Sequence, residues 1–201
     1  MPPDITLTRK YLFITGLGRS GSKLIQNVLR LSPDLAIVSA GETKFMGGFL
    51  GGGFAKKIRA ATNSNAADKL ERIADICIND SPPRDVWNDL KSGKIPRDRL
   101  IETLGQRDLT ESNVYRSILG LRADAECENV LLVDKTPQNL YHVDELLAWL
   151  PESKVVHMIR DPRAVLASAW TRRMREYPDR VYFSVPWPRA VYSVMIVFHV
   201  A

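Results

Sequence analysis

The sequence predicts an α/β protein in which a central parallel sheet is flanked by helices. Short, continuous apolar runs, typical of strands buried on both faces, alternate with segments whose apolar residues recur at helical spacing. This alternation is the pattern of a parallel sheet that helices cover on both sides. The chain has 201 residues, of which 45% are hydrophobic, which suits one domain with a sizeable core. We expect a single domain over residues 1–201.

The first predicted strand is residues 11–15, an apolar run that ends in Gly16. A helix follows the turn after Gly16, because apolar residues recur at helical spacing: Leu24, Ile25, Val28 and Leu31. The sequence Ser-Pro-Asp at 32–34 stops this helix, and residues 35–38 form the second predicted strand.

Five glycines between residues 47 and 53 predict a mobile loop or lid. The pattern is helical from about residue 66 to 122, and prolines and a glycine divide this region into short helices: Pro82, Pro83, Gly93 and Pro96. We interpret residues 66–122 as a helical insertion packed against the sheet.

The third predicted strand is residues 130–133, and Thr136 caps a helix that begins with Pro137. This helix carries four apolar residues: Leu140, Val143, Leu147 and Leu150. Residues 154–159 form the fourth strand. Asp161 and Pro162 then open a last helix with three residues facing inward: Val165, Leu166 and Ala169.

No apolar stretch approaches the ~20 residues that span a bilayer, and no signal peptide precedes the first strand. Cys77 and Cys127 have no CxxC or histidine-rich neighbours, which argues against a metal site or a disulfide scaffold. These features predict a cytoplasmic protein. Residues 190–201 stop inside an apolar run, so we expect the chain to be truncated at its carboxyl end.

The net charge of +5 is unevenly distributed. Five basic residues and no acidic one lie between Arg9 and Arg30, and eight basic with three acidic residues lie between Lys154 and Arg189. Two basic regions in an otherwise acidic chain suggest an anionic ligand held from two sides. Neither region has the aromatic interleaving or the motifs of a nucleic-acid-binding protein, so we expect no nucleic-acid partner.

The turn after the first strand has the composition of a phosphate-binding loop. Gly16 and Gly21 have the spacing of a Walker loop, but Ser22 and Lys23 stand in the reverse of its Lys-Ser/Thr order. The loop lies between a strand and a helix, so its amide groups and the helix dipole converge on one point. Arg19 adds a planar fork of donors, and Ser20 and Ser22 add hydroxyls.

A second basic motif is KVVHMIRDPRAVLASAW at 154–170. Arg160 follows the fourth strand, at the edge where open α/β sheets bind ligands, and Ser168 lies on the next helix. A ligand beside that helix would contact both residues. Taken alone the motif is weak, because Arg160 and Asp161 are equally consistent with a capping pair.

Together, GRSGS at 18–22 and HMIRDPRAVLAS at 157–168 resemble the sulfotransferases that use 3′-phosphoadenylyl sulfate (PAPS). The resemblance extends from about residue 11 to 170 and implies a fold like that of the P-loop nucleoside triphosphate hydrolases. It implies that the 5′-phosphosulfate is bound by Arg19, Ser20, Gly21 and Ser22, and the 3′-phosphate by Arg160 and Ser168. Lys23 stands where the family often has a hydroxyl residue, which leaves its backbone amide as the binding group.

A general base must accept the proton of the acceptor hydroxyl. Glu42, in GETKFM just after the second strand, resembles the glutamate of carbohydrate and tyrosyl-protein sulfotransferases at this point. A solvated Glu42 paired with Lys44 is the alternative interpretation, and His142 is the alternative base because some family members use histidine. The family often has a lysine at the position of Lys135, which implies a contact with the transferred group or the acceptor.

We therefore expect transfer of a sulfuryl group from PAPS to a hydroxyl of a carbohydrate, lipid, tyrosine or small molecule, leaving adenosine 3′,5′-bisphosphate (PAP). Arg19 and the loop amides are expected to stabilise charge on the leaving nucleotide. This chemistry needs no metal, and Asp134 is the best candidate for a Walker-type metal ligand. Two alternatives remain: a small-molecule kinase that uses ATP and Mg²⁺, and a catalytically degenerate nucleotide-binding domain.

Overall fold

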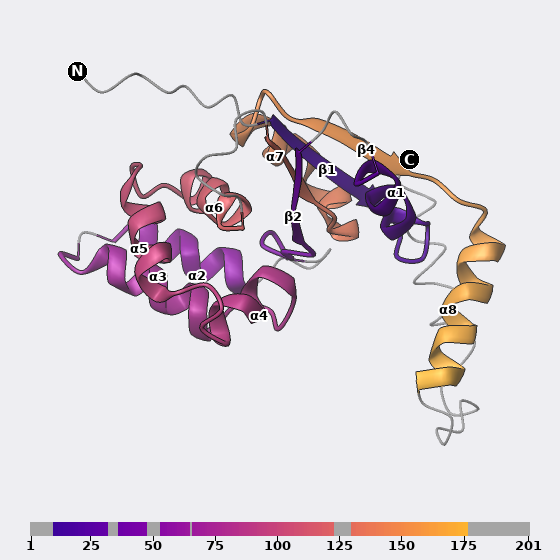
Figure 1. The fold of residues 1–201 in the computed structure, drawn as a ribbon, viewed down its shortest axis with the longest axis horizontal. Coiled ribbons are helices and arrows are strands. Elements are labelled where there is room, and N and C mark those ends of the chain that lie inside the picture. Colours follow the sequence, from indigo (N-terminus) through magenta and orange to yellow (C-terminus); the bar gives the residue numbers. More distant parts are fainter. Residues whose placement is uncertain (1–9, 32–35, 48–52, 65, 123–129, 177–201) are drawn as a thin grey trace.

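Four parallel strands form the centre of the protein in the computed structural model, which describes residues 10–31, 36–47, 53–64, 66–122 and 130–176. The strands are β1 (Lys10–Gly16), β2 (Ala36–Gly41), β3 (Val130–Asp134) and β4 (Lys154–Met158). They lie in the order β2-β3-β1-β4 (Figure 1). All four strands predicted from the sequence are present, and the α/β fold with helices around a parallel sheet is confirmed.

Helices connect the strands and cover the sheet. In chain order they are α1 (Ser22–Leu29), α2 (Gly53–Thr62), α3 (Lys69–Asn79), α4 (Asp85–Lys91), α5 (Arg97–Gly105), α6 (Glu111–Gly120), the 3₁₀ helix η1 (Pro137–His142), α7 (Val143–Trp149) and α8 (Pro162–Glu176). Helices α2 to α6 lie between β2 and β3 and form the insertion. The sequence predicted that the helical insertion begins at about residue 66. It begins earlier, because α2 is also helical and packs against α3.

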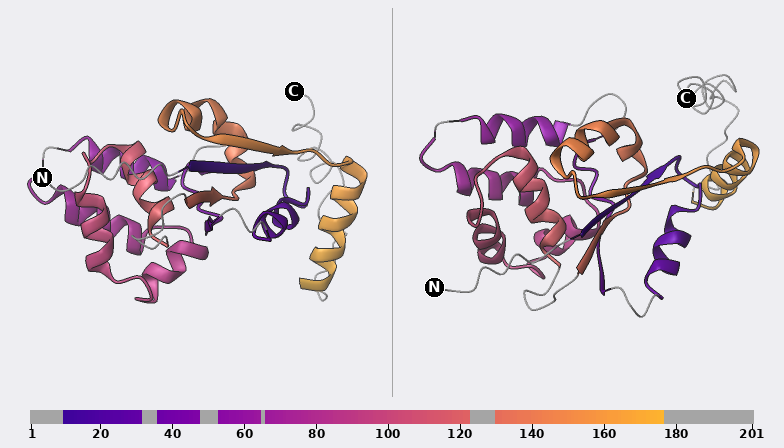
Figure 2. Two further views of the ribbon diagram at one scale, coloured as in Figure 1. Left: turned by 45° about the horizontal axis from the view of Figure 1, so that its top comes forward. Right: turned by 90° about the horizontal axis from the view of Figure 1, so that it is seen from above.

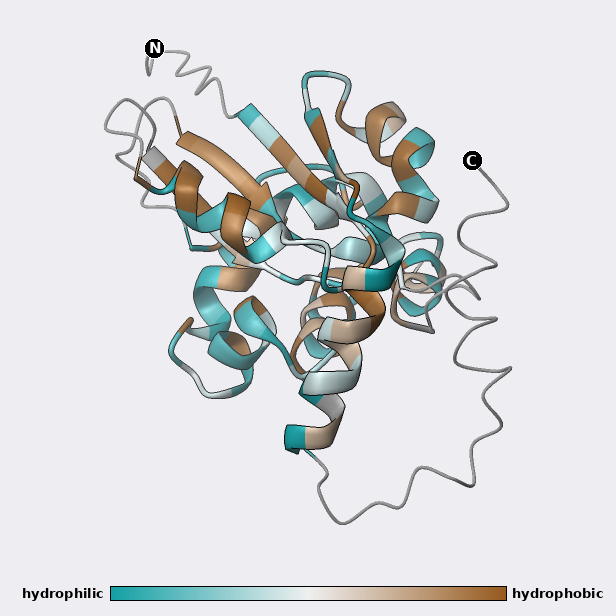
Figure 3. Cartoon of the chain, turned by 90° about the vertical axis from the view of Figure 1, so that its right-hand side faces the viewer, coloured by the Kyte–Doolittle hydropathy of each residue, from teal (hydrophilic) through white to brown (hydrophobic). Residues whose placement is uncertain are grey.

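The sheet buries a different set of strand residues on each face, as the alternation of side chains along a strand requires. Leu12, Ile14 and Val133 form a small cluster on one face, against which Ile25 and Leu29 of α1 pack. Tyr11, Phe13, Val130 and Leu132 belong to a larger core shared with the insertion. Figure 3 shows the hydrophobic positions gathered along the strands.

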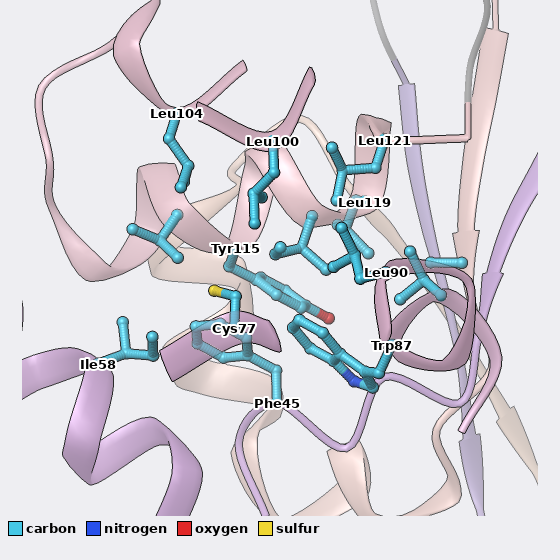
Figure 4. Close-up of a cluster of buried hydrophobic side chains, with 14 of the residues drawn as sticks. Phe45, Ile58, Cys77, Trp87, Leu90, Leu100, Leu104, Tyr115, Leu119 and Leu121 are labelled. Atoms are coloured by element: carbon cyan, nitrogen blue, oxygen red, sulfur yellow. The ribbon is translucent and has the colours of Figure 1, made fainter. Parts of the chain in front are cut away.

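The larger core is built around aromatic residues of the insertion (Figure 4). Tyr115 of α6 stacks on Phe13 of β1 with ring centroids 6.2 Å apart, and it lies 4.8 Å from Phe45. Trp87 of α4 makes an edge contact with Phe54 of α2. The insertion therefore has no core separate from that of the sheet.

Helix α1 forms as expected, but most of the apolar residues that predicted it are exposed. Leu24, Val28 and Leu31 are 67%, 53% and 82% exposed, whereas Ser22 and Gln26 are buried. The helical spacing identifies the helix correctly but not its inner face. The polar residues are turned inward because they border a cavity that is described below.

The helix predicted after Thr136 is divided into η1 and α7, and Leu146 and Leu150 are buried while Leu147 is 37% exposed. In α8, Val165 is buried as expected but Ala169 is exposed. Figures 1 and 2 show α8 at the opposite end of the molecule from the insertion. Most of the glycine-rich stretch 47–53 and the apolar carboxyl end lie outside the described residues.

Candidate functional site

The carboxyl ends of the four strands border one cavity of about 870 Å³. The segment after each strand contributes one of the predicted site residues to its lining: Arg19 after β1, Glu42 after β2, Lys135 after β3 and Arg160 after β4. Open α/β sheets bind their ligands at this edge, and the volume is in the range of small-molecule sites.

The loop between β1 and α1 needs glycine at two positions. Gly16 has φ +133°, and a Cβ on it would lie 2.5 Å from the carbonyl oxygen of Met158 on β4. Gly21 has φ +103° and precedes α1, and no side chain caps the helix there. The first N–H groups of a helix lack partners within the helix. In α1 the N–H groups of Leu24 and Ile25 both donate to the Gly21 carbonyl oxygen, which leaves those of Ser22 and Lys23 available to an anion at the cavity wall.

Two hydrogen bonds join this loop to the segment from β4 to α8. Arg19 Nε donates to Ser168 Oγ at 3.1 Å, and Arg160 Nη1 donates to the carbonyl oxygen of Arg19 at 3.0 Å. Arg19 itself has a left-handed backbone with φ 73°, which is uncommon for a residue with a side chain. The two motifs that the sequence suggested separately therefore form one wall of the cavity.

Ser22 and Lys23 also line the cavity, whereas Ser20 does not. Ser20 is 6% exposed, and among the described residues its Oγ has no hydrogen-bond partner. Its assignment to the 5′ site therefore stays a prediction.

Glu42 forms ion pairs with two cations on the opposite wall. Lys135 Nζ lies 2.5 Å from Oε1, and Arg84 Nη1 lies 3.3 Å from Oε2. Burial raises the pKa of the Glu42 carboxyl, but the hydrogen bond and charge of Lys135 and the charges of Arg84 and Lys44 outweigh it, so the pKa lies below its ordinary value. Glu42 is ionised at neutral pH and, in this arrangement, is a weaker base than a free glutamate.

The insertion holds the backbone around Glu42. Asp85 Oδ2 accepts the Glu42 N–H at 2.8 Å, and Trp87 Nε1 donates to the Thr43 carbonyl oxygen at 2.6 Å. Asp85 approaches so closely that a Cβ on Gly41 would overlap its side chain. Asp85 also has an unusual φ of 43°, and residues with such strained backbones are common at functional sites.

Asp134 connects the segments that carry Glu42 and Lys135. Its buried carboxylate accepts hydrogen bonds from Thr43 Oγ1 at 2.7 Å, Thr136 Oγ1 at 2.6 Å, Tyr115 Oη at 2.5 Å and Asn139 Nδ2 at 3.1 Å. Burial raises the pKa of Asp134, although these hydrogen bonds oppose the increase. Because its oxygens already accept these four hydrogen bonds and one from the Thr43 N–H, and because Asp134 does not line the cavity, Asp134 is not arranged as a Walker-type metal ligand.

The alternative base, His142, does not line the cavity. Its Nδ1 lies 3.8 Å from Glu145 Oε2 at the start of α7. The alternative interpretation, in which Glu42 is solvated and paired with Lys44, names the wrong partner. The ion pairs of Glu42 are with Lys135 and Arg84.

Sequence reasoning missed Arg84, Asp85 and the polar side of α1. Arg84 and Asp85 lie more than forty positions from Glu42 in the chain, and no short motif connects them. A signal was present for α1, because polar residues recur on it at helical spacing and all of them line the cavity: Lys23, Gln26, Asn27 and Arg30.

Within the described parts of the chain, no group of three or more histidine, cysteine, aspartate or glutamate side chains is placed to hold a metal ion. No helix in those parts has both the length and the apolar character needed to cross a membrane.

A family model described as the sulfotransferase family matches residues 12–184 of the chain. The match includes β1 from Leu12 onward, the other three strands, the insertion and both cavity motifs. Searches against curated proteins and against solved structures gave no match.

Proposed function

The chain belongs to the sulfotransferase family, and we propose that it moves a sulfuryl group from PAPS to the hydroxyl of an acceptor. One observation carries the choice of donor: the uncapped start of α1, Arg19, Arg160 and Ser168 are joined in one wall of the cavity. Such a wall suits a ligand with phosphate groups at two positions.

The residues present fit the donor. The free N–H groups of α1 and the unpartnered Ser20 hydroxyl suit the 5′ end, where several acceptor oxygens are close together. Arg160 and Ser168 would hold the 3′-phosphate, and Arg19 lies between the two positions. Charge-assisted hydrogen bonds from arginine are the strong contacts in such sites.

PAPS, when bound, supplies a sulfuryl group on a good leaving group. Glu42 would accept the proton of the acceptor hydroxyl, since it lines the same cavity as the loop but follows β2, which β3 separates from β1 in the sheet. Once Glu42 is protonated, Lys135 loses its anionic partner and becomes available to the negative charge that develops during transfer. Arg19 and the N–H groups of α1 would stabilise the leaving nucleotide.

The donor is tested by calorimetric titration with PAP, 5′-AMP, and ATP with Mg²⁺. We expect PAP to bind about ten- to a hundredfold more tightly than 5′-AMP, because only PAP has the 3′-phosphate. Arg160→Gln should remove most of this difference, and EDTA should leave PAP binding unchanged. Equal affinities for PAP and 5′-AMP, or tight binding of ATP with Mg²⁺ alone, would contradict the proposal and favour a kinase.

Binding of PAP without transfer from labelled PAPS to any hydroxyl acceptor would instead support a catalytically degenerate domain.

A further inference from the structure

We propose that the acceptor carries an anionic group, a carboxylate or a sulfate ester, next to the hydroxyl that is sulfated, and that Arg84 binds this group. The inference rests on the proposed function, because it assumes that Glu42 meets the acceptor. It names the class of acceptor and gives a role to an arginine that the insertion supplies.

The acceptor hydroxyl and two cations compete for the carboxylate of Glu42. Both carboxylate oxygens have a cationic partner, Lys135 on Oε1 and Arg84 on Oε2. Each carboxylate oxygen can accept more than one hydrogen bond, so an acceptor hydroxyl can donate to Glu42 beside these cations, but it competes most readily with the cation that is held less closely. The Lys135 side chain is 11% exposed and that of Arg84 is 47% exposed, and the Arg84 contact is the longer one. Arg84 is the partner that can leave.

Arg84 needs a new anionic partner once its side chain leaves Glu42. A neutral acceptor would take Oε2 and leave the guanidinium without an anion. An acceptor with its own anionic group gives Arg84 a new partner of the same kind, often with two parallel hydrogen bonds. The exchange also favours catalysis, because the charge of Arg84 lowers the pKa of Glu42 and its departure makes Glu42 a stronger base.

The backbone at Arg84 stays in place while the side chain moves. Arg84 N–H donates to the carbonyl oxygen of Pro82 at 2.8 Å, and Asp85 is held to the Glu42 N–H. The side chain of Arg84 thus turns on a fixed support at the start of α4.

The cavity lining has more basic than acidic side chains. Lys44 and Arg84 lie beside Glu42, and Arg30 ends α1 on the same cavity. Arg122 also lines the cavity but is paired with Asp89. Among the described lining residues only Glu42 and Asp85 are acidic, and Asp85 is held by the Glu42 backbone. A negatively charged acceptor therefore meets an excess of positive charge.

The test uses two matched pairs that differ in one charge: 4-hydroxyphenylacetate with its amide, and methyl β-glucuronide with its amide. Binding of each compound is measured calorimetrically to the PAP-saturated full chain. It is measured for the unmodified protein, for Arg84→Gln and for Arg97→Gln. Arg97 is the matched control, since it lies in the same insertion, pairs with Glu71 and Asp75, and does not line the cavity.

We expect at least one acid to bind about tenfold or more tightly than its amide. Arg84→Gln should reduce this ratio at least about fivefold, and Arg97→Gln should leave it unchanged. Equal binding of acid and amide, no binding of either acid, or a preference that persists in Arg84→Gln would overturn the proposal.

The acid and amide are also titrated without PAP. Failure of PAP to bind would contradict the proposed function, while an acid preference that depends on Arg84 would still support the anion site. Labelled PAPS then shows whether the compound that binds is also sulfated.

Discussion

Partial burial and the cations Lys135, Arg84 and Lys44 act together on the Glu42 carboxylate. Glu42→Gln preserves the shape of the side chain and removes its ability to accept a proton. We expect turnover to fall by about 10²- to 10⁴-fold, the usual contribution of a positioned general base. PAP affinity should change little, because the donor contacts lie on the opposite wall. Turnover is measured with labelled PAPS and PAP affinity by calorimetry.

Arg19→Ala is the contrasting variant, and it should weaken donor binding as well as turnover, since Arg19 lies between the two donor motifs. Near-normal turnover in Glu42→Gln, combined with loss of activity in His142→Ala, would show that the base is assigned to the wrong residue.

The charge state of Glu42 gives a prediction on pH. Burial raises its pKa, but Lys135 and the weaker effects of Arg84 and Lys44 bring it below the ordinary glutamate value of 4.5. The base form therefore persists below that pH, and the stability from these ion pairs is lost only as pH falls through the lowered pKa. Lys135→Met should raise the pKa of Glu42, which ¹³C NMR titration of its carboxyl group measures without an assay of activity.

Lys44→Met is the matched control, because Lys44 acts on Glu42 only by its charge and has the smallest effect. A larger increase in the pKa in Lys44→Met than in Lys135→Met would refute this account of the site.

The junction of β2 with α4 is the element on which the acceptor wall depends. Gly41 has φ +82°, and a Cβ there would overlap Asp85, whereas Gly93 has φ +74° and open space around it. Gly93→Ala should cost about 1–2 kcal/mol of unfolding free energy for the left-handed backbone alone. Gly41→Ala should cost more and should also reduce turnover, since Asp85 must release the Glu42 N–H. Chemical denaturation measures both, and equal losses would show that Asp85 moves aside freely.

The elements were largely predictable from the sequence, but their faces and contacts were not. Apolar runs identified all four strands: β1 and β3 are buried along almost their whole length, and β4, at the edge of the sheet, has partly buried apolar residues although Lys154 and His157 are exposed. In α1 the periodicity identified a helix but not its inner face, since polar Ser22 and Gln26 are buried at the cavity. Helix α2 was missed because the preceding glycines indicated a loop.

The two donor motifs were found because each is local in the chain, whereas their junction through Arg19 and Ser168 depends on the order of the strands. Arg84 and Asp85 were missed for the same reason. They reach Glu42 only through the packing of the insertion, and residues in contact across a core leave no spacing pattern in a single sequence.

For the whole molecule, the shared core predicts that insertion and sheet unfold together. Cys77 of α3 is fully buried in the same cluster as Phe13 and Leu132 of the sheet, and burial raises the pKa of its thiol. In a Cys127→Ser background, the thiol should react with a labelling reagent only when the whole domain opens. We expect its labelling and the loss of far-ultraviolet circular dichroism to give the same unfolding free energy. Labelling of Cys77 at lower denaturant would show that the insertion opens by itself.

The division of the cavity between two walls also bears on how such a protein diversifies. The wall that holds Arg19, Arg160 and Ser168 is formed by α8 and by the short loops that lead from β1 to α1 and from β4 to α8. Its geometry is therefore tied to the fold. The facing wall receives Arg84 and Asp85 from the exposed turn that begins α4, whereas the buried positions of the insertion are tied to the core of the sheet. Changes confined to that turn are thus a route by which natural variation, or a protein engineer, can alter acceptor choice without rebuilding the donor site or the core.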